Sequence, residues 1–130
     1  MAVKKILVID DDSKNIFALS AVLRSKGYIV VSAAGAEQGL SVLHTDHEIG
    51  IILSDIMMPG IDGFDLIHSI RVDNKTKHLP VVAVTGKAMP GDRQKCIEAG
   101  ADDYISKPVN IDKLISILNK YEIAGSETTD

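Results

Sequence analysis

The sequence contains no tryptophan, one cysteine and four prolines, and only 4% of its 130 residues are aromatic. The single cysteine, Cys96, cannot form an internal disulfide, which favours a reducing compartment. Basic residues are not in excess: the formal net charge is −4, which argues against direct nucleic-acid binding. No apolar run reaches the roughly 18 residues that a membrane span needs. The chain starts without the apolar region of a signal peptide, so we expect a cytoplasmic protein without membrane contact.

What the sequence does have is the composition of a packed domain, with 45% hydrophobic and 25% charged residues. Its length is that of one domain. We expect this domain to cover residues 1–124. Residues 125–130 are small and polar, and we expect them to form a disordered tail.

Short apolar runs alternate with amphipathic segments along the whole chain. The predicted strands cover residues 6–9, 28–33, 49–53, 81–84 and 104–106. Apolar residues at helical spacing predict a helix after each strand, and Gly27 and Gly100 are expected at the ends of the first and fourth helices. Five strands alternating with five helices predict an α/β fold, with a parallel sheet covered on both faces.

Polar side chains follow four of the predicted strands. They are Asp10, Asp11 and Asp12 after the first strand, Asp55 after the third, Thr85 after the fourth and Lys107 after the fifth. The carboxyl ends of parallel strands meet at one edge of a sheet, so we expect these groups to converge. Three or more carboxylates packed together repel one another and need a cation to stay ionised. Mg²⁺, with its preference for oxygen ligands, meets that need.

These residue types suit phosphoryl transfer. A carboxylate can attack phosphorus to form an acyl phosphate. The transferred group spreads negative charge over its oxygens, which positioned cations stabilise. Mg²⁺ could hold one oxygen, Lys107 a second, and the Thr85 hydroxyl with the Gly86 backbone N–H a third. No histidine or cysteine is placed as a base, which disfavours acyl transfer.

Four stretches carry a family resemblance: ILVIDDDSKN at residues 6–15, LSDIMMPGIDG at 53–63, VVAVTGKAM at 81–89 and GADDYISKPV at 100–109. With these motifs, the chain resembles the receiver domains of response regulators, the CheY-like group, from about Lys4 to Tyr121. The resemblance implies a flavodoxin-like, doubly wound sheet of five parallel strands in the order 2-1-3-4-5, with five helices on both faces.

The resemblance also implies the roles of the site residues. Asp55 matches the phosphorylated aspartate, and Asp10 and Asp11 match the acidic pair that binds Mg²⁺ beside it. Mn²⁺ could take the place of Mg²⁺. The backbone carbonyl of Met57 matches a third protein ligand. Gly86 stands where alanine is more common.

The remaining matched residues concern switching. Thr85 matches the hydroxyl that moves to contact the phosphoryl group, and Tyr104 matches the aromatic that turns inward when it does. Lys107 matches the lysine that pairs with the phosphoryl oxygens, and the Lys107–Pro108 bond is similar to one usually found cis.

By the same resemblance, the chain is a signalling switch rather than a metabolic enzyme. It would accept a phosphoryl group from a histidine kinase or a histidine phosphotransfer protein, and assist its own phosphorylation and slow hydrolysis. The face of the last two helices and the fifth strand would then change its affinity for a downstream protein. We expect a monomer or a transient, phosphorylation-dependent dimer.

Two alternatives remain open. The stretch from Asp10 to Ser13 is similar to the motif of haloacid-dehalogenase-type phosphatases, with Asp10 as nucleophile and Thr85 and Lys107 as phosphate binders. The acidic motif that should follow the lysine is missing, however. The other alternative is an interaction module that takes no phosphate.

Several residues have simpler interpretations. Asp12 is expected to cap the first helix, with Ser13 as the other candidate cap. The spacing of His44 and His47 could suggest a metal site, but we expect both histidines to be exposed. We expect Cys96 to be half-buried, without a redox role.

Overall fold

A computed structural model describes residues 4–56, 63–86 and 91–123 of the chain. In order, its helices and strands are β1 (Lys5–Ile9), α1 (Ser13–Ser25), β2 (Val30–Ala33), α2 (Ala36–Thr45), β3 (Ile49–Asp55), α3 (Gly63–Val72), β4 (Val81–Thr85), α4 (Asp92–Ala99), β5 (Asp103–Ser106) and α5 (Ile111–Lys120). In this part of the chain no helix is long and apolar enough to span a membrane.

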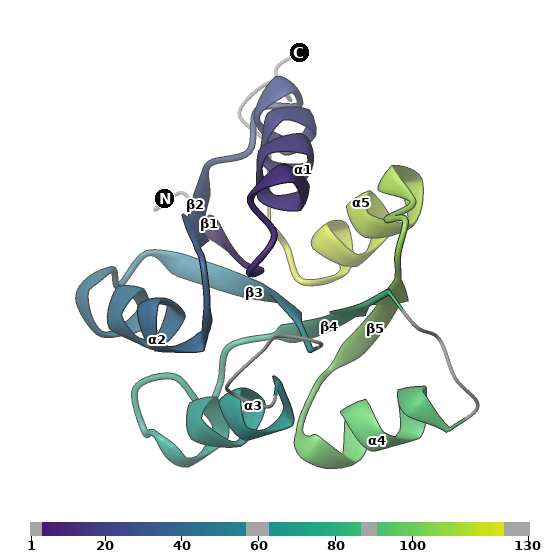
Figure 1. The fold of residues 1–130 in the computed structure, drawn as a ribbon. Coiled ribbons are helices and arrows are strands. Elements are labelled where there is room, and N and C mark those ends of the chain that lie inside the picture. The colour runs from purple at the N-terminus through teal and green to yellow at the C-terminus, as the bar shows by residue number, and fades with distance from the viewer. Residues whose placement is uncertain (1–3, 57–62, 87–90, 124–130) are drawn as a thin grey trace.

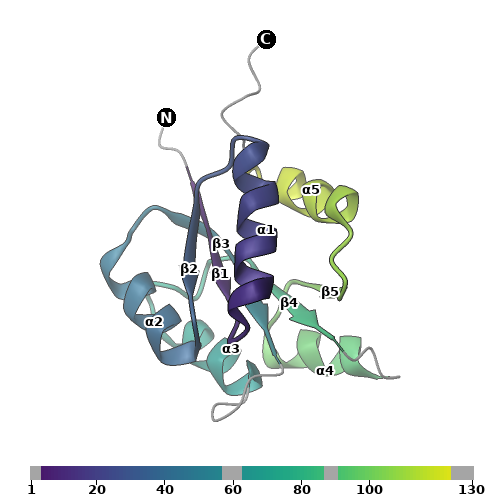
Figure 2. The ribbon, with the colours of Figure 1, turned by 45° about the horizontal axis from the view of Figure 1, so that its top comes forward.

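The strands form one five-stranded sheet in the order β2-β1-β3-β4-β5. Every neighbouring pair is parallel. Helices α2, α3 and α4 cover one face of the sheet, and α1 and α5 cover the other (Figures 1 and 2). The predicted fold class, strand order and two-sided cover are therefore confirmed.

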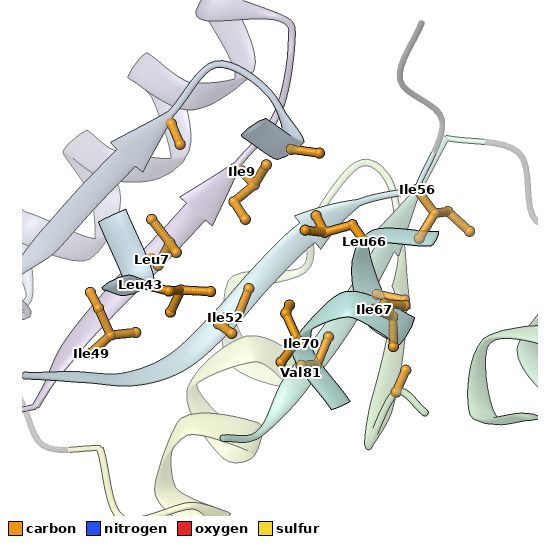
Figure 3. Close-up of a cluster of buried hydrophobic side chains, with 14 of the residues drawn as sticks. Leu7, Ile9, Leu43, Ile49, Ile52, Ile56, Leu66, Ile67, Ile70 and Val81 are labelled. Atoms are coloured by element: carbon orange, nitrogen blue, oxygen red, sulfur yellow. The ribbon is translucent and has the colours of Figure 1, made fainter. Parts of the chain in front are cut away.

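Successive side chains along each strand point to opposite faces of the sheet and belong to two separate hydrophobic clusters. In β1, Leu7 and Ile9 pack toward α2 and α3, whereas Ile6 and Val8 pack toward α1 and α5. Figure 3 shows the cluster on the first of these faces, where side chains of α2 and α3 meet those of β1 and β3. All of β3 is buried, as expected for the central strand of a sheet covered on both faces.

A close approach of α2 to β1 helps to fix the carboxyl end of β1. A Cβ atom added at Gly39 would lie 2.5 Å from Cδ1 of Ile9, so glycine allows the helix to pack directly on that residue. Ile9 is the last residue of β1, and Asp10 follows it. The position of Asp10 thus depends on packing beneath it.

One strand boundary and the burial of one residue differ from expectation. The second strand starts at Val30 rather than Tyr28, because α1 ends in a turn: Gly27 has φ +90° and the Tyr28 N–H donates to the Leu23 carbonyl. Cys96 is fully buried rather than half-buried, since α4 packs it into the cluster of Figure 3. Gly100 has φ +116° and ends α4 as predicted, while the predicted start of that helix near Met89 lies outside the described residues.

The amino edge of the sheet is held by Arg71, at the end of α3. Its Nε donates to the Gly100 carbonyl at 2.8 Å, and one terminal nitrogen donates to the Lys77 and Leu79 carbonyls at 2.8 and 2.7 Å. The other terminal nitrogen lies 2.7 Å from Asp102 Oδ2. One guanidinium thus ties α3 to the segments that lead into β4 and β5.

A second cation at the amino edge is Lys5, the first residue of β1. Its Nζ lies 3.0 Å from Asp46 Oδ2 and 3.1 Å from Glu48 Oε1. Both acids precede β3, so the pairing joins the starts of two neighbouring strands. It is an ion-pair group with one positive and two negative charges.

Candidate functional site

Three carboxylates meet at the carboxyl edge of the sheet. Asp10 follows β1 and Asp55 ends β3, and the pairing of Ile9 with Ser54 places the two side by side. Asp10 and Asp55 are each 5% exposed, whereas the neighbouring Asp11 is exposed. One carboxylate oxygen from each of the three lies within 4.8 Å of the others. The structure therefore gathers the predicted acidic group from two adjacent strands.

Lys107 reaches the same group from the end of β5. Its Nζ lies 3.0 Å from Asp10 Oδ2 and 3.1 Å from Asp55 Oδ2. The Lys107 backbone N–H donates to the Thr85 carbonyl at 2.7 Å, which extends the β4–β5 ladder past its last pair. The next peptide bond, Lys107–Pro108, is cis. The predicted convergence of the first, third and fifth strand ends is thus observed.

The Asp10 carboxylate is held by both of its oxygens. Oδ2 faces Lys107, and Oδ1 accepts from the Asp12 backbone N–H at 2.9 Å. Asp12 itself caps α1, since its side chain accepts from the Lys14 N–H at 2.9 Å. Ser13 is the first residue of the helix, so the cap is Asp12 and not Ser13. Sequence reasoning missed the Asp10–Asp12 contact, although an aspartate two residues before a turn is its usual signal.

Charge at this edge is out of balance. Burial lowers the pKa of Lys107, but the hydrogen bonds that its ammonium donates to Asp10 and Asp55 together raise it by more, so its pKa lies above the ordinary value of 10.5. Lys107 is therefore charged at neutral pH. Its Nζ pairs with Asp10 and Asp55, and Asp11 lies in the same cluster, so among the described residues at this edge three carboxyl groups share one lysine.

The donor set fits a hard divalent cation. Its carboxylate oxygens are the ligands that Mg²⁺ prefers. Oxygens on opposite sides of one Mg²⁺ are about 4.2 Å apart, so small side-chain rotations would bring a set that spans 4.8 Å into place. The expected third ligand, the Met57 carbonyl, lies outside the described residues.

Thr85 and Tyr104 share one face of the sheet. Thr85 ends β4 and is fully buried, and Gly86 follows it. Tyr104 pairs with Ala83, two residues before Thr85, so the three side chains project to the same side. Tyr104 is half-buried, and burial, with smaller contributions from Asp92 and Cys96, raises its pKa. The two residues are neighbours on the face that α4 covers.

Gly86 departs from the family pattern without a steric consequence. A Cβ at this position would lie 3.9 Å from Cδ of Lys107, which is ordinary van der Waals contact. Alanine would therefore fit. Gly86 follows β4, the strand that pairs with β3 as far as Asp55.

Comparison with known proteins shows the family of the chain. A family model described as the response regulator receiver domain matches residues 6–119. The chain belongs to the response regulator receiver family.

Relatives in this family include whole proteins and small parts of large ones. The chain is 35% identical over 119 residues to the two-component response regulator ORR12 of Oryza sativa subsp. japonica, which covers 92% of this chain and 98% of ORR12. It is 34% identical over 125 residues to the hybrid signal transduction histidine kinase I of Dictyostelium discoideum, covering 92% of this chain but 7% of the kinase. Receivers thus occur both alone and inside kinases.

A solved structure extends the comparison to the metal. The receiver domain of the sensor histidine kinase PA1611 from Pseudomonas aeruginosa PAO1, described with a magnesium ion coordinated in the active-site cleft, has a TM-score of 0.82. It is 32% identical, and the match covers 92% of this chain and 98% of that one. Its fold is the fold of the chain described here.

Proposed function

We propose that this receiver accepts a phosphoryl group on Asp55 from a histidine kinase or a histidine phosphotransfer protein. The observation that carries the proposal is the placement of Asp55. Its carboxylate is 5% exposed at the carboxyl edge, 3.1 Å from the Lys107 ammonium and within one cluster with Asp10 and Asp11. A carboxylate beside an ammonium group at a sheet edge is suited to attack phosphorus once a bound metal ion offsets the neighbouring acids.

In the proposed reaction, an Asp55 oxygen forms a bond to phosphorus while the bond to the donor breaks, and the electron pair leaves with the donor. Lys107, already beside Asp55, moves with the new phosphoryl group and pairs with one of its oxygens. The Gly86 N–H donates to another. Mg²⁺, held by Asp10, Asp11 and Asp55, supplies charge stabilisation for the phosphoryl oxygens when bound. The backbone carbonyl of Met57 is proposed as its further protein ligand.

The same proposal covers switching. The hydroxyl of Thr85 moves to contact the phosphoryl group, and Tyr104 turns toward the space that Thr85 leaves. Both lie on the α4 face, so their shift would change the population of two arrangements of α4, β5 and α5, and with it the affinity for a partner protein. The domain acts as a switch that assists its own phosphorylation and hydrolysis. A cytoplasmic location is part of this proposal, because the free thiol of Cys96 fits a reducing compartment.

A phosphatase that uses Asp10 as nucleophile has less support. Both Asp10 oxygens are engaged, one by Lys107 and one by the Asp12 N–H. The haloacid-dehalogenase alternative is therefore kept only as an outcome of the experiment below.

The test is intact mass spectrometry after incubation with acetyl phosphate, with and without Mg²⁺. We expect the wild type to gain one phosphoryl group only with Mg²⁺, and Asp55→Asn to gain none. The matched control is Asp46→Asn, which alters a lysine-paired aspartate at the opposite edge and should be phosphorylated like the wild type.

Other outcomes would overturn the assignment. A gain that survives in Asp55→Asn but is lost in Asp10→Asn would favour the phosphatase alternative. No gain in the wild type, with Mg²⁺ binding intact, would indicate an interaction module that takes no phosphate.

A further inference from the structure

A cavity of about 310 Å³ lies between α1 and the segment that leads into α5. Its polar lining is confined to Asp10, Asn15, Asp55 and Lys107, so it reaches the acidic group at the carboxyl edge. Its volume is at the lower end of the range for small-molecule sites. The proposed phosphorylation leaves this space without a role.

The rest of the lining is apolar. It comes from the sheet, from α1 and from the chain after Lys107: Val8, Ile9, Leu53, Val84, Ala18, Leu19, Val22, Pro108, Val109 and Ile111. The cavity runs back along the strands from the acidic group. On α1 it extends from Asn15 to Val22, about 10 Å at the usual rise per residue.

In-line phosphoryl transfer does not use this space. The leaving group of a phosphodonor lies opposite the attacking Asp55 oxygen, and therefore points away from the end of β3. The cavity lies on the other side, beside Leu53 and Val84, which precede Asp55 and Thr85 in their strands. A ligand that fills the cavity would thus approach the acidic group from within.

The charged residues at the end of the cavity near the acidic group determine which polar group a ligand can carry there. Lys107 is the one cation among the described residues that line the cavity; it faces Asp10 and Asp55, and Asp11 lies beside them in the acidic cluster. An anionic head would be repelled unless a metal were present, whereas a cationic head would reduce the imbalance.

We infer that the cavity binds a small amphiphile with an apolar body and one ammonium or amidinium head. The body lies between α1 and the Pro108–Ile111 segment, and the head donates hydrogen bonds to the carboxylates of Asp10 and Asp55. Because these oxygens also form the candidate magnesium site, the ligand and Mg²⁺ compete.

The probe is a series of primary alkylammonium ions, from butyl to octyl, titrated into the metal-free protein and followed by amide NMR shifts. Each methylene that enters the cavity should tighten Kd by about fourfold. The gain should stop when the cavity is full. Octanoate, with the same body and an opposite charge, should bind far more weakly.

Two alanines of α1 provide a matched pair of variants. Ala18 lines the cavity, whereas Ala21 is exposed on α1 and does not line it. Ala18→Leu should weaken binding of hexylammonium at least tenfold, and Ala21→Leu should leave it unchanged. Circular dichroism and thermal melting establish that both variants are folded.

Equal weakening by both variants, binding of octanoate as tight as octylammonium, or no saturable shift in the wild type would each overturn the inference. Added Mg²⁺ should raise the apparent Kd of the amine, and amine binding that is indifferent to Mg²⁺ would contradict the placement of the head. None of these readouts depends on phosphorylation, so failure here leaves the role of Asp55 untouched.

Discussion

Two lysines at opposite edges of the sheet have nearly the same local geometry. Lys107 lies 3.0 and 3.1 Å from the carboxylates of Asp10 and Asp55, and Lys5 lies 3.0 and 3.1 Å from those of Asp46 and Glu48. The lysine side chains are also similarly exposed, at 22% and 25%.

What differs is the burial of the acids. The side chains of Asp10 and Asp55 are 7% and 6% exposed, whereas those of Asp46 and Glu48 are 21% and 60% exposed. Water screens the excess negative charge at the amino edge, so the Lys5 group needs no further cation. At the carboxyl edge the excess negative charge is poorly screened and attracts a further cation. Burial of the partners, rather than the ion-pair geometry, separates a structural pairing from a candidate metal site.

The largest effect that we predict is a loss of stability at the amino edge of the sheet. Arg71 lies at the amino edge with Lys5, but its side chain is 22% exposed and donates four hydrogen bonds, mostly to backbone carbonyls. Arg71→Ala would leave those carbonyls without their donor and should lower the free energy of unfolding by about 3 kcal/mol, as measured in urea.

The control for this variant is Arg93→Ala, on the exposed side of α4, which should change stability by less than about 0.5 kcal/mol. If Arg71→Ala were as mild as its control, hydrogen bonding at the amino edge would contribute little. The difference between the two edges would then depend on their position in the sheet and not on how deeply their polar groups are buried.

The second-largest predicted effect concerns Lys107, the lysine at the carboxyl edge. Lys107→Met leaves two buried carboxylates without their cation and should cost about 2 kcal/mol in metal-free solution, less than for a fully buried pair because Lys107 is partly exposed. Mg²⁺ should restore part of the loss, since it binds the folded state at the same carboxylates.

Lys5→Met is the matched variant at the amino edge. Its stability loss should be small, should shrink further in high salt and should not respond to Mg²⁺. Equal losses for the two lysine variants would contradict the role given to burial. A loss for Lys107→Met that Mg²⁺ cannot reduce would count against the candidate metal site.

Sequence patterns located the carboxyl edge well, for a physical reason. Short apolar runs alternating with helices permit few topologies, and parallel strands bring their carboxyl ends together. Asp10, Asp55 and Lys107 could therefore be expected to meet although 97 residues separate the first from the last. Their chemical types then indicated a phosphoryl site.

The amino edge could not be predicted in the same way. Most partners of Arg71 are backbone carbonyls, which leave no mark in the sequence, and its one acidic partner, Asp102, is 31 residues away. For the same reason the sequence pattern did not indicate the partner of His44, which is exposed as predicted and whose Nε2 lies 3.2 Å from Asp73 Oδ2. Loops bring these partners together, and loop paths depend on packing.

Burial was also hard to anticipate where a segment has little apolar content. Helix α4, DRQKCIEA, shows no clear apolar stripe, so the full burial of Cys96 follows only from how the helix is docked. The cavity beside α1 has a similar origin. It depends on small side chains such as Ala18 facing the segment after Lys107, a juxtaposition without a sequence signature.

The smallest predicted effect is a pH dependence at the amino edge. Hydrogen bonds from the Glu48 backbone N–H and then from Lys5 hold the pKa of Asp46 below its ordinary value of 3.8. A carboxyl whose pKa is lower in the folded state stabilises that state above its unfolded pKa, and the contribution is lost as pH falls through the folded value.

Asp46→Asn keeps an acceptor for the Glu48 N–H but removes the charge. Its melting temperature should therefore lie slightly below that of the wild type above about pH 5, with the gap closing as pH falls below 3.8. A gap that persists at lower pH would mean that shape and hydrogen bonding, rather than charge, account for the Lys5 pairing. If Asp46→Asn lost as much stability as Lys107→Met, exposure to water would not have screened the charges around Lys5.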